Sequence, residues 1–410
     1  MIRTLVITIG LSTASIASAD PGLEAFTSYY AFGDSLSQDD KLPQLTPPSL
    51  DGRFSSGRVW TEYLADVFIN AGKDTRNFAL GGATAGAENT TPYEGFFPAP
   101  RTPAQDAQLA QLRAISTFDG QVQVAQATVP DPGDNPLVSV LFGANDIFQK
   151  LPNVVAEALN TSDPLEIPGR VAAGIGALAS ETVGSIVSGI NKLHAGNDAF
   201  DDFLVVNLAD ISKTPAFGAW GIGAAQAELD ALIAAGAPLD DITAAAIQLE
   251  FLSADPSFAK LASLAFNETL AAALAGLAPG IETLDEDIQI SVFDQAAFLE
   301  DFIATSALNG INVSEPCTPS FTANAGISCV YVTDDAGNII GLDLPQAENF
   351  FFGDSVHPTG FVQEEFGRRV IASLEGQMPA PVPLPAGLPL LVAGLGAFGL
   401  IARRKTKRAA

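Results

Sequence analysis

The chain has 410 residues, 47% of them apolar, and it carries 47 acidic against 20 basic residues. Between residues 20 and 385 the imbalance is larger, because only 14 basic residues face all 47 acidic ones, a net charge of −33. The apolar content is ordinary for a globular protein. The charge would repel phosphate backbones and anionic membranes, which argues against a nucleic-acid-binding function.

The N-terminus has the three parts of a secretory signal peptide, which we predict over residues 1–19. Arg3 supplies a positive charge, an apolar run extends to Ile16, and Ala17-Ser18-Ala19 forms a small-residue cleavage site. A membrane anchor is the alternative, but Thr and Ser interrupt a run that is too short to span a bilayer. The sequence therefore predicts an exported protein that is cleaved after Ala19.

Short apolar runs, each flanked by Gly, Asp or Asn, are typical of buried strands. They cover residues 28–32, 75–80, 137–142, 203–208 and 288–293. Ala-rich stretches alternate with them and carry apolar residues three and four positions apart, as from Val171 to Ile190 and from Leu261 to Leu277, which predicts helices. This alternation predicts an α/β fold with a mainly parallel sheet of five strands.

The Ala-rich segment over about residues 220–287 is longer than a simple crossover between two strands. We therefore predict a helical insertion there, of a kind that often walls or covers a substrate cleft. The sequence has no internal repeat, so residues 20–378 are interpreted as one domain with insertions.

The two cysteines, Cys317 and Cys329, lie close together in a segment rich in Pro, Ser, Thr and Asn. An exported chain enters an oxidising compartment, so we expect a disulfide across this local loop. Closing a loop of this size contributes about 3 kcal/mol in the chain-entropy model. Metal binding is the weaker alternative, because two thiolates with no nearby histidine make a poor site.

Histidine is scarce, with two in 410 residues, and this limits where a base acting near neutral pH could lie. His357 lies in Gly353-Asp354-Ser355-Val356-His357-Pro358, whereas His194 lies at a predicted helix end, where a surface or capping role is expected. Far upstream, Gly33-Asp34-Ser35-Leu36 places a serine at a turn directly after the first predicted strand. These residues suggest a Ser-His-Asp arrangement built from both ends of the chain.

The composition changes sharply near residue 379, and residues 379–410 form a segment with three parts. A Pro-rich linker precedes an uncharged stretch from Gly387 to Ala402, and the last eight positions hold five basic residues. With residues 384–386 included, the uncharged stretch is just long enough to span a bilayer, and its basic end should stay cytoplasmic. We therefore predict a C-terminal transmembrane segment.

The tail also resembles a known class of bacterial sorting signals. Val382-Pro383-Leu384-Pro385-Ala386, followed by an apolar stretch and a basic cluster, is similar to the VPLPA variant of PEP-CTERM signals. The resemblance implies processing by an exosortase-like enzyme. A plain tail anchor is the alternative.

Motifs in a fixed order resemble the GDSL family of serine esterases and lipases, also called SGNH hydrolases after their Ser, Gly, Asn and His blocks. They are Gly33-Asp34-Ser35-Leu36, Asn77-Phe78-Ala79-Leu80-Gly81-Gly82-Ala83-Thr84, Gly143-Ala144-Asn145-Asp146 and Asp354-Ser355-Val356-His357-Pro358. The resemblance covers roughly residues 28–374, and it implies a three-layer α/β/α sandwich like that of flavodoxin. The predicted insertion and the cysteine loop lie outside the motifs.

The resemblance implies a role for each marked residue. Ser35 would be the nucleophile, His357 the base, and Asp354 the acid that holds the imidazole in its productive tautomer. The backbone N–H groups of Ser35 and Gly82 and the side-chain amide of Asn145 would form an oxyanion hole, with Gly81 as the alternative to Gly82. This chemistry requires no cofactor or metal.

The function expected from these residues is an exported serine hydrolase that cleaves acyl esters of a lipid or an acylated small molecule. Removal of acetyl groups from a polysaccharide is the alternative enzymatic function, and a non-catalytic surface or matrix protein is the alternative of another class. Ser355 is interpreted as a spacer, because a nucleophile two residues from its base would leave no room for substrate. The sequence contains no G-x-S-x-G motif, which argues against the α/β-hydrolase fold.

Overall fold

A computed structural model describes residues 22–376, with gaps at 43–44, 46, 98, 162, 164, 255–256, 322–327 and 335–337. The predicted signal peptide, residues 1–19, and the predicted C-terminal sorting and transmembrane segment, residues 379–410, lie outside the described residues.

The central sheet of the described residues has five parallel strands in the order β2-β1-β3-β4-β5. They are β1 (Ser28–Gly33), β2 (Asp74–Asn77), β3 (Pro136–Leu141), β4 (Asp202–Val206) and β5 (Gln289–Phe293). Every residue of β1 and β3 is buried, as a strand covered on both faces requires. The order is that of a doubly wound sheet whose direction of winding reverses between β1 and β3.

All five predicted strands are confirmed. The largest difference between predicted and observed bounds is in the second strand. β2 ends at Asn77, whereas the apolar run predicts a strand to residue 80. The chain beyond Asn77 still follows β1, because the N–H groups of Phe78 and Leu80 bond to the carbonyls of Ala31 and Gly33 at 2.7 and 3.0 Å. This extension carries the two glycines that follow Leu80 to the carboxyl end of the sheet.

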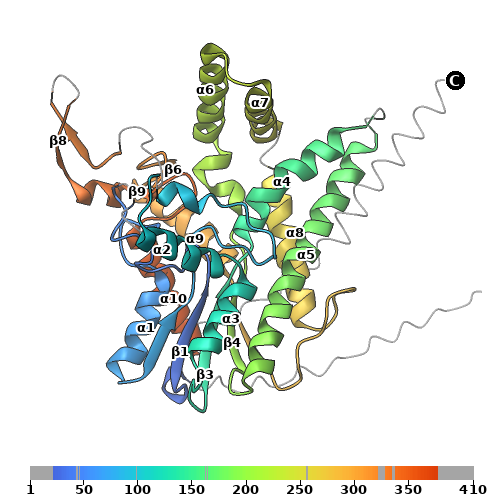
Figure 1. The fold of residues 1–410 in the computed structure, drawn as a ribbon, viewed down its shortest axis with the longest axis vertical. Helices are drawn as coiled ribbons and strands as arrows, with labels where there is room; N and C mark the ends of the chain where they lie inside the picture. Colours follow the sequence, from blue (N-terminus) through green and yellow to red (C-terminus); the bar gives the residue numbers. More distant parts are fainter. Residues whose placement is uncertain are drawn as a thin grey trace, which may run out of the picture.

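Helices cover both faces of the sheet and form the outer layers of a three-layer sandwich (Figure 1). They are α1 (Trp60–Asn70), α2 (Pro103–Ala114), α3 (Phe118–Thr128), α4 (Ala144–Leu159), α5 (Ile167–Gly196), α6 (Ala219–Ala235), α7 (Leu239–Ala254), α8 (Ser257–Leu274), α9 (Gln295–Leu308) and α10 (Gly360–Leu374). Short 3-10 helices are η1 (Leu23–Ala25), η2 (Tyr93–Phe96), η3 (Ile211–Lys213), η4 (Pro215–Phe217) and η5 (Leu344–Asn349).

Alternate residues of each strand point into two separate cores. Tyr30 and Phe32 of β1 pack with α3, α4, α5 and α8, whereas Tyr29 and Ala31 pack with α1, α9 and α10. This division follows from the two-residue period of a strand. The three-layer α/β/α sandwich expected from the motifs is confirmed.

The predicted helical insertion is present, but its helices have two different roles. α6 and α7 pack against each other and project from the body of the protein (Figure 1). α8 instead packs along α5, so it is the crossover helix between β4 and β5. The Ala-rich composition is common to all three helices, and this is why the sequence alone does not separate the projecting pair from the core helix.

α5 is the described helix that is long and apolar enough to cross a membrane, judged by length and composition. In the most apolar 18-residue segment of this helix, 44% is buried within the protein. Its buried residues, which include Val183, Val187 and Ile190, belong to the core on that face of the sheet. A core helix therefore accounts for its apolar character.

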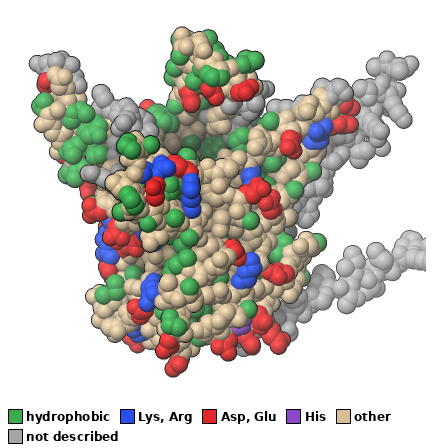
Figure 2. All heavy atoms as spheres, in the orientation of Figure 1, with side chains coloured by type: hydrophobic (Ala, Val, Ile, Leu, Met, Phe, Trp, Pro, Cys, Tyr) green, Lys and Arg blue, Asp and Glu red, His purple; other side chains and the backbone are tan. Residues whose placement is uncertain are grey.

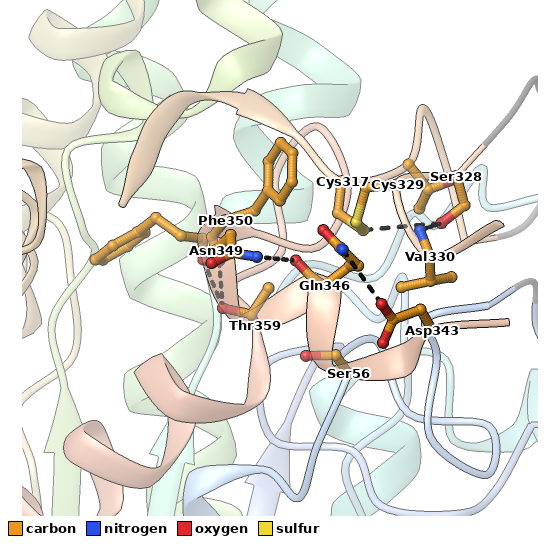
Figure 3. Close-up of a disulfide and its surroundings, with 12 residues drawn as sticks. Ser56, Cys317, Ser328, Cys329, Val330, Asp343, Gln346, Asn349, Phe350 and Thr359 are labelled. Carbon is orange, nitrogen blue, oxygen red and sulfur yellow. Dashed lines mark hydrogen bonds between the residues drawn. A yellow bond between two sulfur atoms is a disulfide. The ribbon is translucent and has the colours of Figure 1, made fainter. Parts of the chain in front are cut away.

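The expected disulfide between Cys317 and Cys329 is confirmed, with 4.8 Å between the two Cα atoms (Figure 3). It lies near two small sheets, one of β6 (Asn312–Pro316) with β9 (Phe350–Phe352) and one of β7 (Tyr331–Thr333) with β8 (Ile339–Leu342). The backbone N–H groups of Cys317 and Thr318 donate to the carbonyls of Phe352 and Gly353 at 3.0 and 2.9 Å. The disulfide loop is thus joined to the backbone directly before Asp354.

Candidate active site

Ser35 lies in a tight turn at the carboxyl end of β1. The carbonyl of Asp34 accepts the N–H groups of Ser37 and Gln38 at 3.1 and 3.0 Å, so the chain turns sharply as soon as the strand ends. A Cβ atom at Gly33 would lie 2.9 Å from the Leu141 carbonyl oxygen, so the neighbouring strand leaves no room for a side chain there. Ligand sites in doubly wound sheets lie at this edge, where the strand order reverses.

The residues predicted to form the triad are arranged with His357 between the other two, within hydrogen-bonding distance of both. His357 Nε2 lies 2.7 Å from Ser35 Oγ, and His357 Nδ1 lies 2.8 and 2.9 Å from the two carboxylate oxygens of Asp354. Ser35 and Asp354 are buried, at 6% and 4% exposure. These distances are those of a nucleophile, its base and the acid that orients the base.

Asp354 is held in its ionised form. Burial alone would raise its pKa, but the neighbouring imidazole of His357, with the backbone N–H groups of Val356 and His357, outweighs burial and lowers the pKa. Both N–H groups donate to Asp354 Oδ1, at 3.0 and 2.8 Å. A charged Asp354 accepts the Nδ1–H of His357, which leaves the Nε2 lone pair directed at Ser35.

Two aromatic rings that the sequence analysis did not identify pack beside the imidazole of His357. The ring of Phe54 lies 4.7 Å from it and that of Phe321 lies 6.1 Å from it, centroid to centroid. Phe321 comes from the disulfide loop, and its ring fills the space that a Cβ at Gly353 would need. The cysteine loop therefore contributes to the site, although no motif marks it.

The two glycines of the second motif differ in what their N–H groups do. The Gly81 N–H donates to Gln38 Oε1 at 2.7 Å, whereas the Gly82 N–H and the Ser35 N–H meet no acceptor among the described residues. Gly82 has a φ of +79°, a conformation that favours glycine. Of the pair, Gly82 is therefore the one with an unused donor.

Asn145 and Asp146 lie in the first turn of α4, shortly after β3 ends. The side-chain amide of Asn145 donates one hydrogen to the Ala83 carbonyl at 2.9 Å, and the residue lines the same cavity as Ser35. The buried carboxylate of Asp146 accepts the N–H groups of Ala85 and Gly86, both at 2.9 Å. The third motif thus anchors the backbone that follows Gly82.

An apolar cavity of about 560 Å³ opens beside Ser35 and His357. Gly81, Gly82 and Asn145 also line it. Most of its other walls are apolar, including Phe96, Phe148, Leu208, Ile211, Leu299 and Phe352. Figure 2 shows hydrophobic side chains within the recess beneath α6 and α7. The cavity has the size and lining of a site for a mainly apolar ligand.

His194 and Ser355 lie apart from this arrangement. His194 Nδ1 contacts the Phe200 carbonyl at 3.0 Å, and its side chain lies near Asp285 and Asp287, with ligand atoms of the three residues within 4.8 Å of one another. Among the described residues, these three side chains form the group that could hold a metal ion. The group lies at the opposite edge of the sheet from Ser35, because Asp287 comes before the start of β5 whereas Ser35 follows the end of β1. Ser355 does not line the main cavity.

Comparison with known families agrees with the motifs and the geometry. A family model described as GDSL-like lipase/acylhydrolase matches residues 29–370. The chain belongs to this family. It is 39% identical over 174 residues to a phosphatidylcholine-sterol acyltransferase of Aeromonas hydrophila, a match that covers 40% of this chain and 46% of that protein. It is 30% identical over 150 residues to an acetylesterase of Thermothelomyces thermophilus, covering 33% and 46% of the two chains. The chain thus spans about half the length of these relatives.

Asp34, beside the predicted nucleophile, is a buried carboxyl with few partners. Its Oδ1 accepts the Leu36 N–H at 3.0 Å, but its Oδ2 has no hydrogen-bond partner among the described residues. Burial raises its pKa to about 7, and the Leu36 N–H only partly opposes this effect. The folded state therefore keeps a proton on Asp34 at pH values where the unfolded chain has lost it.

We expect Asp34→Asn to stabilise the protein at alkaline pH. A raised folded-state pKa gives stability that is present below the unfolded pKa near 4 and lost as pH rises through about 7. Asparagine keeps the acceptor for Leu36 without the charge, so the free energy of unfolding should rise by up to about 4 kcal/mol at pH 8 and stay unchanged at pH 3. Urea unfolding at both pH values measures this difference.

The matched control is Asp131→Asn, because the exposed Asp131 also accepts an N–H two residues ahead, from Gly133 at 3.2 Å. That variant should have the same stability as the wild type at both pH values. An equal effect of the two substitutions would contradict the special burial of Asp34.

Proposed function

We propose that this protein is a serine hydrolase of acyl esters, and the contact of 2.7 Å between His357 Nε2 and Ser35 Oγ is the observation that carries the proposal. Ser35 Oγ attacks the ester carbonyl carbon while Nε2 takes the hydroxyl proton. The tetrahedral intermediate then breaks its bond to the alcohol oxygen, which receives that proton from the imidazolium. Water attacks the acyl-enzyme by the same route, releasing the carboxylic acid and restoring Ser35.

The developing oxyanion would be held by the Ser35 N–H, the Gly82 N–H and the side-chain amide of Asn145. Gly82 is favoured over Gly81 because the Gly81 N–H already donates to Gln38. The second amide hydrogen of Asn145 remains available, since its other hydrogen donates to Ala83. Donors fixed before the reaction stabilise the oxyanion without reorganisation.

The apolar cavity supports an ester with an apolar acyl chain, from a lipid or an acylated small molecule. A phosphatidylcholine-sterol acyltransferase among the relatives is in keeping with a lipid substrate. An acetylesterase among them favours the alternative, in which the enzyme removes small acetyl groups, for example from a polysaccharide. A non-catalytic surface or matrix protein is disfavoured, because nothing would preserve the geometry of Ser35, His357 and Asp354 in it.

We further propose that the enzyme acts outside the cytoplasm. The signal peptide predicted over residues 1–19 and the disulfide between Cys317 and Cys329 support export. The apolar stretch and basic end of residues 379–410 would hold the chain at the membrane, or at the cell surface after processing by an exosortase-like enzyme.

We expect Ser35→Ala to abolish ester hydrolysis without unfolding the protein. Loss of a triad residue lowers kcat by about 10⁴-fold or more in serine hydrolases. His357→Ala should have a comparable effect, while His194→Ala, at the other edge of the sheet, should keep wild-type activity. Hydrolysis of p-nitrophenyl butyrate and labelling by a fluorophosphonate probe measure this. Full activity in Ser35→Ala would overturn the proposed function.

The length of the acyl chain should distinguish the two enzymatic alternatives. An apolar cavity gains binding energy with each buried methylene group, so kcat/KM on p-nitrophenyl esters should rise from acetate to a medium or long chain. Initial rates on an acetylated polysaccharide, measured beside these esters, provide the comparison. A preference for acetate together with rapid deacetylation of the polysaccharide would favour the deacetylase.

Deletion of residues 383–410 should release a soluble, active esterase. The deletion removes the C-terminal apolar run and five of the twenty basic residues but no residue of the proposed site. Cell fractionation followed by an esterase assay compares it with the full-length chain, which should stay with the membrane or the cell surface. Equal solubility of the two forms would show that the tail anchors nothing.

A further inference from the structure

The backbone from Leu80 to Ala83 has nearly all of its polar groups satisfied. The Leu80 carbonyl accepts the Ala83 N–H at 3.0 Å, and the Gly81 N–H donates to Gln38 Oε1 at 2.7 Å. The Gly82 carbonyl accepts side-chain hydrogen bonds of 2.8 Å from both Asn89 and Thr91. Buried backbone groups are normally paired in this way, so a group left without a partner is informative.

The middle peptide, between Gly81 and Gly82, has a partner at one end only. The hydroxyl of Tyr93 donates to the Gly81 carbonyl at 2.9 Å, while the Gly82 N–H meets no acceptor among the described residues. Because this peptide is trans, its C=O and N–H point in opposite directions. A hydrogen bond that holds the carbonyl therefore also fixes the direction of the N–H.

We infer that Tyr93 is a positioning residue for the oxyanion hole: its hydroxyl holds the Gly81 carbonyl so that the Gly82 N–H faces the cavity. The inference rests on the proposed function, since it assigns Gly82 as an oxyanion donor. Tyr93 lies at the start of η2, between β2 and α2, and no motif of the sequence marks it.

The need for such a residue follows from the glycines. Both sides of this peptide are Gly, the residue with the fewest steric limits on φ and ψ, so the peptide plane could rotate and turn its N–H away from the substrate. Hydrogen bonding to the carbonyl opposes this rotation, and it also polarises the peptide, which makes the N–H a better donor.

The surroundings of Tyr93 suit this role. The residue is 2% exposed, and its ring lies in the core on that face of the sheet. Burial raises the pKa of the hydroxyl, so Tyr93 stays protonated and remains a donor throughout the working pH range. A Cβ at Gly82 would lie 2.5 Å from Thr91 Cγ2, so the loop that carries Tyr93 packs directly on the glycine.

The test is Tyr93→Phe, which keeps the ring and removes the donor. Loss of a whole oxyanion donor lowers kcat by about 10²- to 10³-fold, and a donor that remains but is no longer held should cost less, about tenfold. KM for p-nitrophenyl butyrate should change by less than twofold. The inhibition constant of an alkyl trifluoromethyl ketone, whose adduct with Ser35 carries the oxyanion, should rise by the factor by which kcat falls.

The matched control is Tyr29→Phe. The Tyr29 hydroxyl is also buried and bonds to Ser139 Oγ at 2.8 Å, within the sheet and away from the cavity. That variant should lower the melting temperature about as much as Tyr93→Phe while keeping kcat. Should Tyr93→Phe fail to fold, two other replacements of Tyr93 decide the question: 4-aminophenylalanine, which can donate, should keep kcat, and 4-fluorophenylalanine, which cannot, should lower it.

The outcomes separate this inference from the proposed function. If Ser35→Ala is inactive while Tyr93→Phe has a kcat within twofold of the wild type, the positioning role is wrong and the esterase stands. A raised KM with an unchanged inhibition constant for the ketone would overturn the role too, because Tyr93 would then act as a wall of the cavity. If Ser35→Ala is fully active, the proposed function itself fails.

Discussion

The site depends on the close packing of two chain segments at the starts of α1 and α10. A Cβ atom on Gly57 would lie 2.8 Å from the Cα of Gly360, and the reverse is also true, so neither position has room for a side chain. The Gly360 N–H donates to Ser56 Oγ at 2.9 Å, and the rings of Trp60 and Phe366 stack at 5.0 Å. His357 lies three residues before this contact. A shift of about 1 Å here would break the hydrogen bond between Nε2 and Ser35 Oγ, which joins residues 322 positions apart.

Two buried carboxyl groups near His357 have pKa values shifted in opposite directions by their surroundings. Asp354 receives two backbone N–H groups and the imidazole, which together outweigh burial and lower its pKa. The Asp34 carboxyl group accepts one backbone N–H, that of Leu36, so burial dominates and its pKa rises. The imidazole therefore has a charged acceptor on its Nδ1 side, while the carboxyl group in the turn that holds Ser35 keeps its proton up to about pH 7.

Much of this arrangement was predictable because residues with catalytic chemistry follow strands of the parallel sheet. Ser35 and Asn145 follow buried strands, and the carboxyl ends of parallel strands meet at one edge, so residues distant in sequence converge there. The sequence favoured Gly82 over Gly81 as the oxyanion donor but left Gly81 as the alternative, and the fold shows that Gln38 already binds the Gly81 N–H. Phe54, Tyr93 and Phe321 were not predicted at all, because they lie outside the periodic runs that mark strands and helices, where a single aromatic residue carries no local signal.

Enzymes that form an acyl-enzyme share the groups that make it but differ in the acceptor that takes the acyl group. Acyltransferases and esterases can form the same acyl-enzyme, so the nucleophile, base and oxyanion donors have the same task in both. They differ in the acceptor that attacks next. In the proposed mechanism this acceptor must approach His357 Nε2, because the same imidazole takes its proton. In this chain the ring of Phe54 lies 4.7 Å from that imidazole, and Val356 also lines the cavity. In the proposed mechanism an acceptor approaching from this side meets these apolar side chains, so their shape helps to decide which acceptors can reach Nε2.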